Sequence, residues 1–231
     1  MFTPKTALIV GAGAGLSASL ARLFAANDMK IGLAARDTAK LADLAAEIGA
    51  ETFACDVARP DDVASLFDQV DSTIGEPEVV VFNPSRRVRG ALVDLDPQEV
   101  ADAIMVTAYG AFLVARQAAR RMLKRGQGAI LFTGASAGVK GYPQSAPFAM
   151  GKFALRGLAQ SMARELHPQN IHIDHFVIDG GIASDRRQAP DDAPDSLLDP
   201  DAIAQTYLDI LRQPRSVWAW EIELRPWVER F

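Results

Sequence analysis

Short apolar runs alternate with longer segments in which apolar residues recur at helical spacing. Thr6–Val10 is a continuous apolar run, and Leu16, Leu20 and Phe24 recur on one helical face after a glycine-rich turn. The same alternation predicts strands at Lys30–Ala34, Thr52–Cys55, Val79–Phe82, Ala129–Phe132, Ile171–Ile178 and Val217–Leu224, and helices at Thr38–Ile48, Pro60–Ile74, Pro97–Lys124, Phe148–Leu166 and Asp201–Arg212. Strands separated by helices are typical of an α/β fold with a doubly wound parallel sheet.

Length and composition favour a single domain over the whole chain, residues 1–231. Hydrophobic residues make up 49% of the chain, enough for a substantial core. The formal net charge is −5, and the basic residues form no block longer than Arg86-Arg87-Val88-Arg89. We therefore expect a small-molecule partner, with no nucleic acid and no membrane surface.

The cysteine content and the N-terminal segment predict a cytoplasmic protein. Cys55 is the one cysteine, so it has no intramolecular disulfide partner, and its apolar neighbours predict a small buried side chain. A strand is predicted directly after Lys5, which leaves no room for a signal peptide, and we expect no membrane helix.

A glycine-rich loop lies between the first predicted strand and helix. Gly11, Gly13 and Gly15 would permit a tight turn there and let backbone N–H groups approach a pyrophosphate at the helix N-terminus. Such glycines can also be plain turn residues, but their place in the first strand–helix unit favours dinucleotide binding. The predicted fold is therefore a Rossmann-type sheet.

The end of the second predicted strand favours NADP over NAD. An acidic residue there would bind the adenosine ribose hydroxyls and repel a 2′-phosphate, but Ala34 and Ala35 lead to Arg36. A planar guanidinium suits that phosphate. The alternative is an ordinary solvated arginine.

Several spaced motifs resemble those of the short-chain dehydrogenase/reductase family over nearly the whole chain. Residues 10–17 resemble its glycine loop, Cys55-Asp56-Val57 its adenine-contacting Asp-Val pair, and Asn83 the first residue of its Asn-Asn-Ala-Gly segment. Lys152 resembles the family lysine that holds the nicotinamide ribose. The cofactor contacts that the resemblance implies are Gly11, Gly13, Gly15, Leu16, Arg36, Asp56, Val57, Asn83, Lys152, Gly180 and Ile182.

The departures from the family pattern fall on its chemistry. Phe148 stands at the position of the family's catalytic tyrosine, Ala135 at that of its serine, and Thr107 at that of its asparagine. Asp179 precedes Gly180 where the family often has proline. Because a positioned general acid contributes about two to four orders of magnitude in rate, ordinary carbonyl chemistry should be severely weakened unless another group replaces the tyrosine.

Lys152 and three nearby residues are the candidate catalytic groups. Ser136 could polarise a substrate oxygen or merely cap its loop. Tyr142 carries a phenol, although Gly-Tyr-Pro segments are usually packing turns. Ser145 lies seven positions before Lys152, the spacing at which related enoyl reductases place a tyrosine. Lys152 itself could alternatively be a surface residue with a partly buried stem.

The histidines and the short arginine run allow weaker predictions. His172 and His175 should point to opposite faces of a strand, and no cysteine lies near, so no metal site is expected. Arg86, Arg87 and Arg89 follow the fourth predicted strand, where they could bind an anionic substrate or form a solvated basic turn.

The sequence thus predicts an NADP-preferring short-chain-type oxidoreductase with an atypical active site, acting on a small or medium organic substrate. Its reaction would be carbonyl/alcohol interconversion or reduction of an activated C=C bond. An alternative is a noncatalytic NAD(P)-binding sensor or scaffold, and another is an enzyme that uses Tyr142. The resemblance also implies a homodimer or homotetramer, with Trp218, Trp220 and Trp227 as further apolar contact area or core cover.

The long irregular stretch at residues 183–199 is predicted to be a surface loop. Loops of this length are uncommon without a function, so a substrate lid is one hypothesis and plain disorder is the other.

Overall fold

A seven-stranded parallel sheet forms the centre of the computed structural model, which describes residues 2–185 and 187–229. The strands lie in the order β3-β2-β1-β4-β5-β6-β7, and every neighbouring pair is parallel. Their bounds are β1 Thr6–Val10, β2 Lys30–Ala35, β3 Glu51–Ala54, β4 Val79–Phe82, β5 Gly128–Thr133, β6 Ile171–Ile178 and β7 Glu221–Leu224. The predicted doubly wound α/β fold is confirmed.

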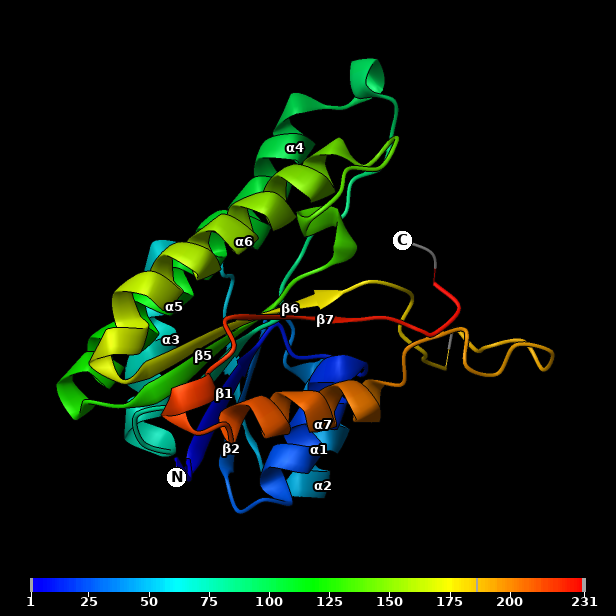
Figure 1. Ribbon diagram of the computed structural model, residues 1–231. Coiled ribbons are helices and arrows are strands. Elements are labelled where there is room, and N and C mark those ends of the chain that lie inside the picture. Colours follow the sequence, from blue (N-terminus) through cyan, green and yellow to red (C-terminus); the bar gives the residue numbers. More distant parts are fainter. Residues whose placement is uncertain (1, 186, 230–231) are drawn as a thin grey trace.

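Helices cover both faces of this sheet (Figure 1). On one face lie α1 Leu16–Ala25, α2 Ala42–Ile48 and α7 Pro200–Leu211; on the other lie α3 Pro60–Thr73, α5 Gly110–Arg125 and α6 Ala146–Leu166. Helix α4 Pro97–Ile104 packs against α6 beyond the sheet. Both faces of the central strands are therefore buried, which explains why these strands are continuous apolar runs.

The strand order reverses between β1 and β4. The chain moves outward from β1 to β2 and β3, and then returns to place β4 on the other side of β1. In this register Val10 lies beside both Ala34 and Phe82, so three strands end at one edge. Ligands of open α/β sheets bind outside the carboxyl ends of the strands at such a reversal.

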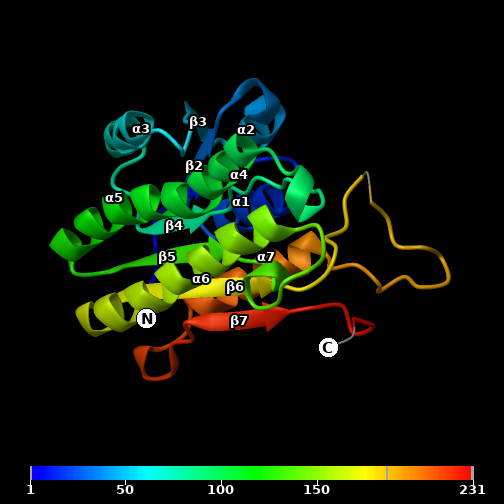
Figure 2. The same cartoon turned by 90° about the horizontal axis from the view of Figure 1, so that it is seen from above.

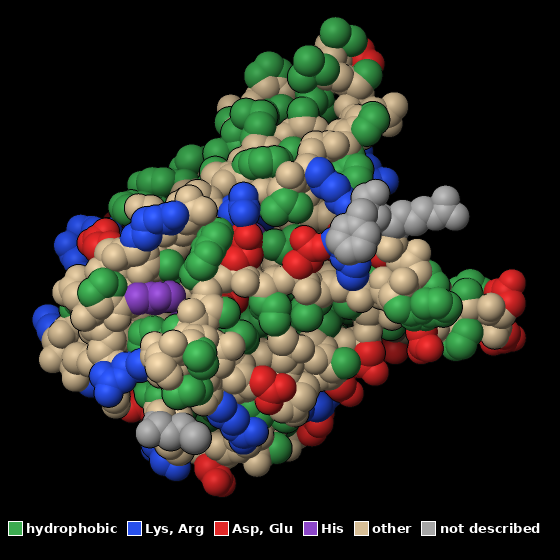
Figure 3. All heavy atoms as spheres, in the orientation of Figure 1, with side chains coloured by type: hydrophobic (Ala, Val, Ile, Leu, Met, Phe, Trp, Pro, Cys, Tyr) green, Lys and Arg blue, Asp and Glu red, His purple; other side chains and the backbone are tan. Residues whose placement is uncertain are grey.

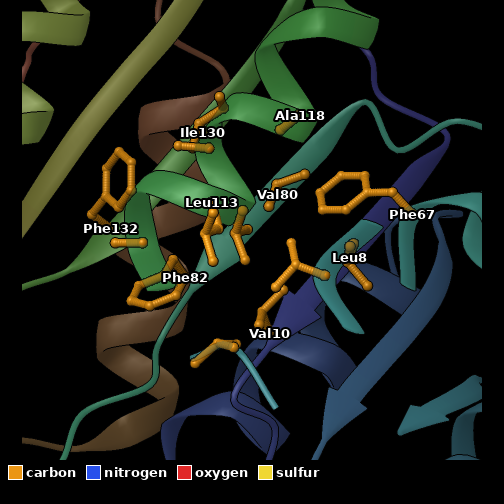
Figure 4. Close-up of a cluster of buried hydrophobic side chains, with 14 of the residues drawn as sticks. Leu8, Val10, Phe67, Val80, Phe82, Leu113, Ala118, Ile130 and Phe132 are labelled. Carbon is orange, nitrogen blue, oxygen red and sulfur yellow. The ribbon is translucent and has the colours of Figure 1, made fainter. Parts of the chain in front are cut away.

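Two apolar clusters hold the layers together. Figure 4 shows the cluster under α3, α5 and α6, where Phe67, Phe82, Phe132, Leu8 and Ile130 pack across four elements. The second cluster lies under α1, α2 and α7, and its largest fully buried side chain is Tyr207. The side chains on the two faces alternate along each strand.

The long helix predicted at Pro97–Lys124 contains an irregular turn. Residues Met105–Tyr109 form a π-helical segment between α4 and α5. Within it, the Thr107 side chain is 1% exposed and faces α6 at Gly151. Such single π turns are frequent at functional sites.

The last predicted strand is shorter than the apolar pattern indicated. Arg215–Val217 is a 3₁₀ turn, and β7 begins only at Glu221. The Trp218 ring stacks on His172 with centroids 4.4 Å apart, and its Nε1 donates to the Gln213 carbonyl at 3.1 Å. The Trp218 side chain is thus held by contacts outside the strand ladder.

By length and apolar composition, one helix in residues 2–185 and 187–229 could cross a membrane: Pro97–Arg125, with 29 residues. Its inner side packs in the core through Val114, Ala118 and Met122. A core helix satisfies the same two criteria, so they do not by themselves make this helix a membrane span.

Residues 183–185 and 187–199 leave the body of the protein as an extended loop (Figures 1 and 2). The base of the loop is closed by an isolated bridge between Ile182 and Leu198, and Ser184 pairs with Arg187 a short way out. The structure therefore tethers both ends of the segment next to the carboxyl edge of the sheet.

Close contact between α6 and the π segment predicts opposite effects for two glycine substitutions in one helix. An added Cβ at Gly151 would lie 2.9 Å from Thr107 Cβ, whereas at exposed Gly157 it would have no neighbour within 4 Å. In urea unfolding at fixed protein concentration, Gly151→Ala should lower the free energy of unfolding by roughly 1–3 kcal/mol. Gly157→Ala should raise it by about 0.5–1 kcal/mol. Equal stabilisation by both would contradict the packing described.

Candidate functional site

The glycine loop makes a tight turn directly above the strand reversal. Gly11 has φ +79°, and a Cβ there would lie 2.7 Å from the Pro84 nitrogen, so only glycine fits. The N–H groups of Gly11 and Ala12 both donate to the Ala34 carbonyl, at 2.9 and 3.0 Å. The loop is thereby fixed to the ends of β2 and β4.

Asn83 connects this loop to the rest of the site. Its Nδ2 donates to Ser17 Oγ at 2.7 Å, and that hydroxyl donates to the Gly11 carbonyl at 3.2 Å. Asn83 therefore orients the start of α1 from the end of β4.

The N-terminus of α1 remains available to an anion. Gly15 is its N-cap, no side chain caps it, and no acidic residue lies in its first turn. Added Cβ atoms at Gly13 and Gly15 would meet nothing within 4 Å, so the backbone is open to a ligand. These features fit a dinucleotide pyrophosphate.

A cavity of about 710 Å³, here called the loop cavity, extends from the glycine loop past the end of β2. It is lined by Gly11, Ala12, Gly13, Ala14, Ala35, Arg36, Asp37, Lys40, Cys55, Asp56, Val57, Asn83, Pro84, Ser85 and Val106. The candidate residues Arg36, Asp56 and Val57 thus share one cavity. Leu16 instead has its side chain in the core, so only its backbone could face the loop.

Two further residues of the loop cavity have defined roles in the structure. Burial and the carboxylates of Asp62 and Asp56 raise the pKa of the Cys55 thiol to about 12, so this buried cysteine stays protonated. The Asp37 carboxylate pairs with Lys40 at 3.0 Å and accepts from the Ala39 N–H at 3.2 Å.

Lys152 lies in a second cavity, here called the lysine cavity. This cavity is lined by Asn83, Ser85, Arg87, Thr133, Gly134, Ala135, Phe148, Lys152, Ile178, Gly180, Ile182, Ser184 and Arg187. It shares Asn83 and Ser85 with the loop cavity, so the two lie side by side at the strand ends. Gly180 and Ile182, both predicted cofactor contacts, lie in its wall.

Lys152 is almost completely removed from solvent, with 3% of its surface exposed. Its Nζ donates to the Thr133 carbonyl at 2.7 Å, and the Thr133 hydroxyl shares a hydrogen bond of 2.9 Å with Tyr207. Burial, followed by the nearby Arg87 guanidinium, lowers the pKa of Lys152 from 10.5 to about 7. This lysine is a core residue, and it can both hold and release a proton near neutral pH.

Phe148 forms the apolar side of the lysine site. It is 8% exposed and packs with Ala135 and Ala137 in a small separate cluster. Lys152 Nζ lies 5.9 Å from the centre of its ring, and the Arg87 guanidinium carbon lies 4.4 Å from the same point. Two cations thus flank a ring that has no hydroxyl.

The other three candidate catalytic residues line a third cavity, here called the serine cavity, of about 460 Å³. Its lining includes Ser136, Tyr142 and Ser145, and it shares Arg87, Ala135, Phe148, Ile178 and Gly180 with the lysine cavity. Tyr142 is 42% exposed, so much of its side chain faces solvent. Lys152 does not line the serine cavity, and Phe148 lies between the two.

Asp179 and Thr107, two residues at which the sequence departs from the family pattern, are engaged in structural contacts. Asp179 is 3% exposed and pairs with Lys140 at 3.2 Å and Arg225 at 3.4 Å. Thr107 Oγ1 accepts from the Arg86 N–H at 3.3 Å. Arg86 in turn pairs with Asp102 at 2.9 Å, so this arginine holds its loop against α4 and lines neither the lysine cavity nor the serine cavity.

The histidines of β6 lie on opposite faces of the sheet, as the strand alternation predicted. His172 donates from Nε2 to the Ala219 carbonyl at 2.9 Å, and burial lowers its pKa to about 4. His175 donates from Nδ1 to Glu221 at 3.0 Å, and burial lowers its pKa to about 4 as well. Within residues 2–185 and 187–229, no three His, Cys, Asp or Glu side chains gather in a metal-binding group.

Sequence patterns missed Arg187, whereas they had named Arg87 as a candidate ligand for an anionic substrate. Arg187 reaches the lysine cavity from the loop 183–199, and Arg87 lies over Phe148 from the segment after β4. The basic run at Arg86-Arg87-Val88-Arg89 was the available signal for Arg87, whereas nothing in the local pattern singled out Arg187.

The reversal point, the glycine loop and the adjoining cavities define a dinucleotide-binding α/β protein. The family model described as short chain dehydrogenase matches residues 5–193. The chain therefore belongs to the short-chain dehydrogenase/reductase family of NAD(P)-dependent oxidoreductases.

Individual relatives match more than nine-tenths of the chain. The chain is 26% identical over 220 residues to carbonyl reductase family member 4 of Xenopus tropicalis, covering 91% of this chain and 92% of that one. A short-chain dehydrogenase from Rhodopseudomonas palustris has a TM-score of 0.84 and 34% identity, over 96% of this chain and 99% of that one. A metagenomic short-chain oxidoreductase in complex with NADP has a TM-score of 0.83 and 27% identity, over 96% of this chain and 97% of that one.

The burial of Lys152 predicts a specific pH dependence of stability. Between pH 7 and 10.5 the unfolded chain binds a proton on this lysine that the folded chain has released, so stability rises with pH in that window. Urea unfolding of wild type and Lys152→Met should show the wild-type value rising relative to the variant by up to about 1.4 kcal/mol per pH unit. Parallel pH profiles for the two proteins would mean that Lys152 stays charged in the fold.

Proposed function

We propose that this protein is an NADP-preferring oxidoreductase that acts on a small or medium organic substrate, with Lys152 in place of the missing tyrosine as the proton-exchanging group. The observation that carries the proposal is the buried Lys152 amine, held by the Thr133 carbonyl at 2.7 Å in a cavity adjoining the loop cavity. Cofactor site and titratable group thus lie along one edge of the sheet.

The NADP preference is supported by charge at the end of β2. Arg36 is exposed and lines the loop cavity with Lys40. Asp37, the nearest carboxylate in sequence, is engaged by Lys40 and the Ala39 N–H. A guanidinium at this position would pair with a 2′-phosphate. The solved relative that contains NADP adds to this support.

The role of Lys152 follows from its protonation. A nicotinamide cofactor bound along this edge would exchange a hydride with the substrate. Because the pKa of Lys152 is about 7, its ammonium form could stabilise negative charge developing on a substrate oxygen and donate a proton to it. The neutral amine could accept that proton in the reverse direction.

Two reactions suit this arrangement. Carbonyl reduction needs a proton on oxygen, and the name of the Xenopus relative points in this direction. Reduction of an activated C=C bond needs no proton donor from the protein, because the negative charge spreads over an enolate and water can deliver the proton to carbon. The Phe148, Ala135 and Ala137 cluster offers an apolar surface to either kind of substrate.

A noncatalytic NAD(P) sensor is the second candidate, and one observation favours it. Phe148 and Ala135, which the resemblance aligns with the family's tyrosine and serine, pack together in one apolar cluster. Cofactor binding needs neither hydroxyl, and Lys152 could bind ribose without turning over a substrate.

We also propose a homodimer or homotetramer built on the outer face of α4, α5 and α6. Hydrophobic side chains gather along this edge of the molecule (Figure 3). The exposed large ones in these helices and the π segment are Met105, Tyr109, Phe112, Leu123, Met150 and Phe153. A contiguous apolar face of this kind is typical of an interface between copies.

The NADP proposal predicts a selective effect of Arg36. In calorimetric titrations, NADPH should bind more tightly than NADH, and Arg36→Ala should weaken NADPH about tenfold to a hundredfold because a charge-assisted hydrogen bond is lost. NADH binding should change little. Lys124→Ala, which removes an exposed charge outside the three cavities, serves as the control. Equal affinities for the two cofactors, unaltered in Arg36→Ala, would contradict the preference.

The role of Lys152 predicts a pH-dependent reduction rate. With NADPH and a set of enones, enoyl thioesters and ketones, turnover should fall as pH rises through the pKa of Lys152, and Lys152→Met should lose about two orders of magnitude or more. Tyr142→Phe should retain turnover, which would exclude Tyr142 as the proton donor. Phe148→Tyr combined with Ala135→Ser separates the two candidate functions: gain of carbonyl reduction shows a productive pocket, whereas silence with intact NADPH binding favours the sensor.

A further inference from the structure

The walls of the lysine and serine cavities carry positive charge only. Four cations line them, namely Arg87, Arg89, Lys152 and Arg187, and no aspartate or glutamate does among the residues that the structure describes. The chain as a whole has the opposite balance, with 24 Lys and Arg against 29 Asp and Glu. The charge of this cleft is therefore a local feature.

Three of these cations have no carboxylate within ion-pair distance in residues 2–185 and 187–229. Arg87, Arg89 and Arg187 form none of the salt bridges found there, whereas the adjacent Arg86 pairs with both Asp102 and Glu99. One loop thus holds an arginine anchored to α4 and two arginines turned to the cavities.

The three guanidinium groups lie close enough to influence one another. Partial loss of water, then the charges of Arg89 and Arg187, lower the pKa of Arg87, although its side chain keeps solvent contact. An anion between these guanidinium groups would relieve the repulsion and accept charge-assisted, bidentate hydrogen bonds.

The residues around Arg87 indicate what chemistry the rest of the ligand would need. Its guanidinium carbon lies 4.4 Å from the centre of the Phe148 ring, and both residues line both cavities. Ala135 and Ala137 extend this apolar surface. Ser136, Gln144 and Ser145 place hydroxyl and amide groups around the serine cavity.

We propose that Arg87 and Arg89 bind an anionic group of the substrate, a carboxylate or a phosphate, while its apolar part lies against Phe148. The inference rests on the proposed function for the position of the reacting carbon, and it makes the substrate class oxo acids or oxo phosphates. Arg187 lines the lysine cavity from the segment after β6, so it would lie beside the bound anion.

The test uses matched anionic and neutral ligands on the full chain saturated with NADP. Calorimetry compares 4-oxopentanoate and 4-oxo-4-phenylbutanoate with their amides, and dihydroxyacetone phosphate with dihydroxyacetone. At least one anion should bind about tenfold or more tightly than its neutral counterpart. The carboxylate and phosphate arms distinguish the two kinds of anion.

Substitutions then locate the site. Arg87→Ala should reduce the preference for the anion to within about threefold, Arg87→Lys should retain part of it, and Arg120→Ala, an exposed arginine of α5 outside the cavities, should retain all of it. NADPH affinity should change less than about twofold in all three variants. Thermal unfolding of each variant without ligand checks that it folds.

Three results would overturn the proposal: no anion preference in wild type, an unchanged preference in Arg87→Ala, or a loss of NADPH affinity in Arg87→Ala as large as the loss of anion affinity. The last result would assign the arginines to cofactor phosphates. Selective anion binding without turnover would support the anion site and count against the proposed oxidoreductase activity. Turnover of neutral ketones with no anion preference would support the proposed oxidoreductase activity and contradict the anion site.

Discussion

Removing Lys152 from water is the constraint on which the character of this site depends. The amine is held by the Thr133 carbonyl at 2.7 Å, at the carboxyl end of β5. Helix α6 can bring it there because Gly138 and Gly151 let backbone and side chains approach closely: an added Cβ would lie 3.0 Å from the Lys152 carbonyl oxygen at Gly138 and 2.9 Å from Thr107 at Gly151. Burial then moves the pKa of the lysine into the neutral range.

We propose that this arrangement changes which groups exchange the proton at a short-chain dehydrogenase site. In such enzymes a lysine cation next to a tyrosine lowers the pKa of the phenol, which exchanges the proton. The sequence resemblance aligns Phe148 with that tyrosine, and the cations Lys152 and Arg87 lie near its ring. The site keeps its positive charge but has no phenol hydroxyl at Phe148. Proton exchange and oxyanion stabilisation would therefore be carried out by the cations themselves.

The sequence predicted the sheet well because strands buried on two faces are continuous apolar runs, which are easy to recognise. It misplaced the start of β7, where Trp218 stacks on a histidine of β6 that is distant in sequence. Lys152 and Phe148 could be paired from sequence because they are one helical turn apart. The Thr133 carbonyl and the guanidinium of Arg87 could not, since chain folding alone brings them to Lys152. The sequence likewise could not predict that Arg86 pairs with α4 while Arg87 lines the cavities, because this depends on how α4 packs.

The most direct test of the account is the protonation of Lys152 in the folded protein. NMR titration of lysine side chains, with the Lys152 signal assigned by its absence in Lys152→Met, reads this without substrate or turnover. We predict one lysine signal, absent in Lys152→Met, that titrates near pH 7. If every lysine titrates near 10, Lys152 is a hydrated cation, and the proposed proton exchange at this site is wrong.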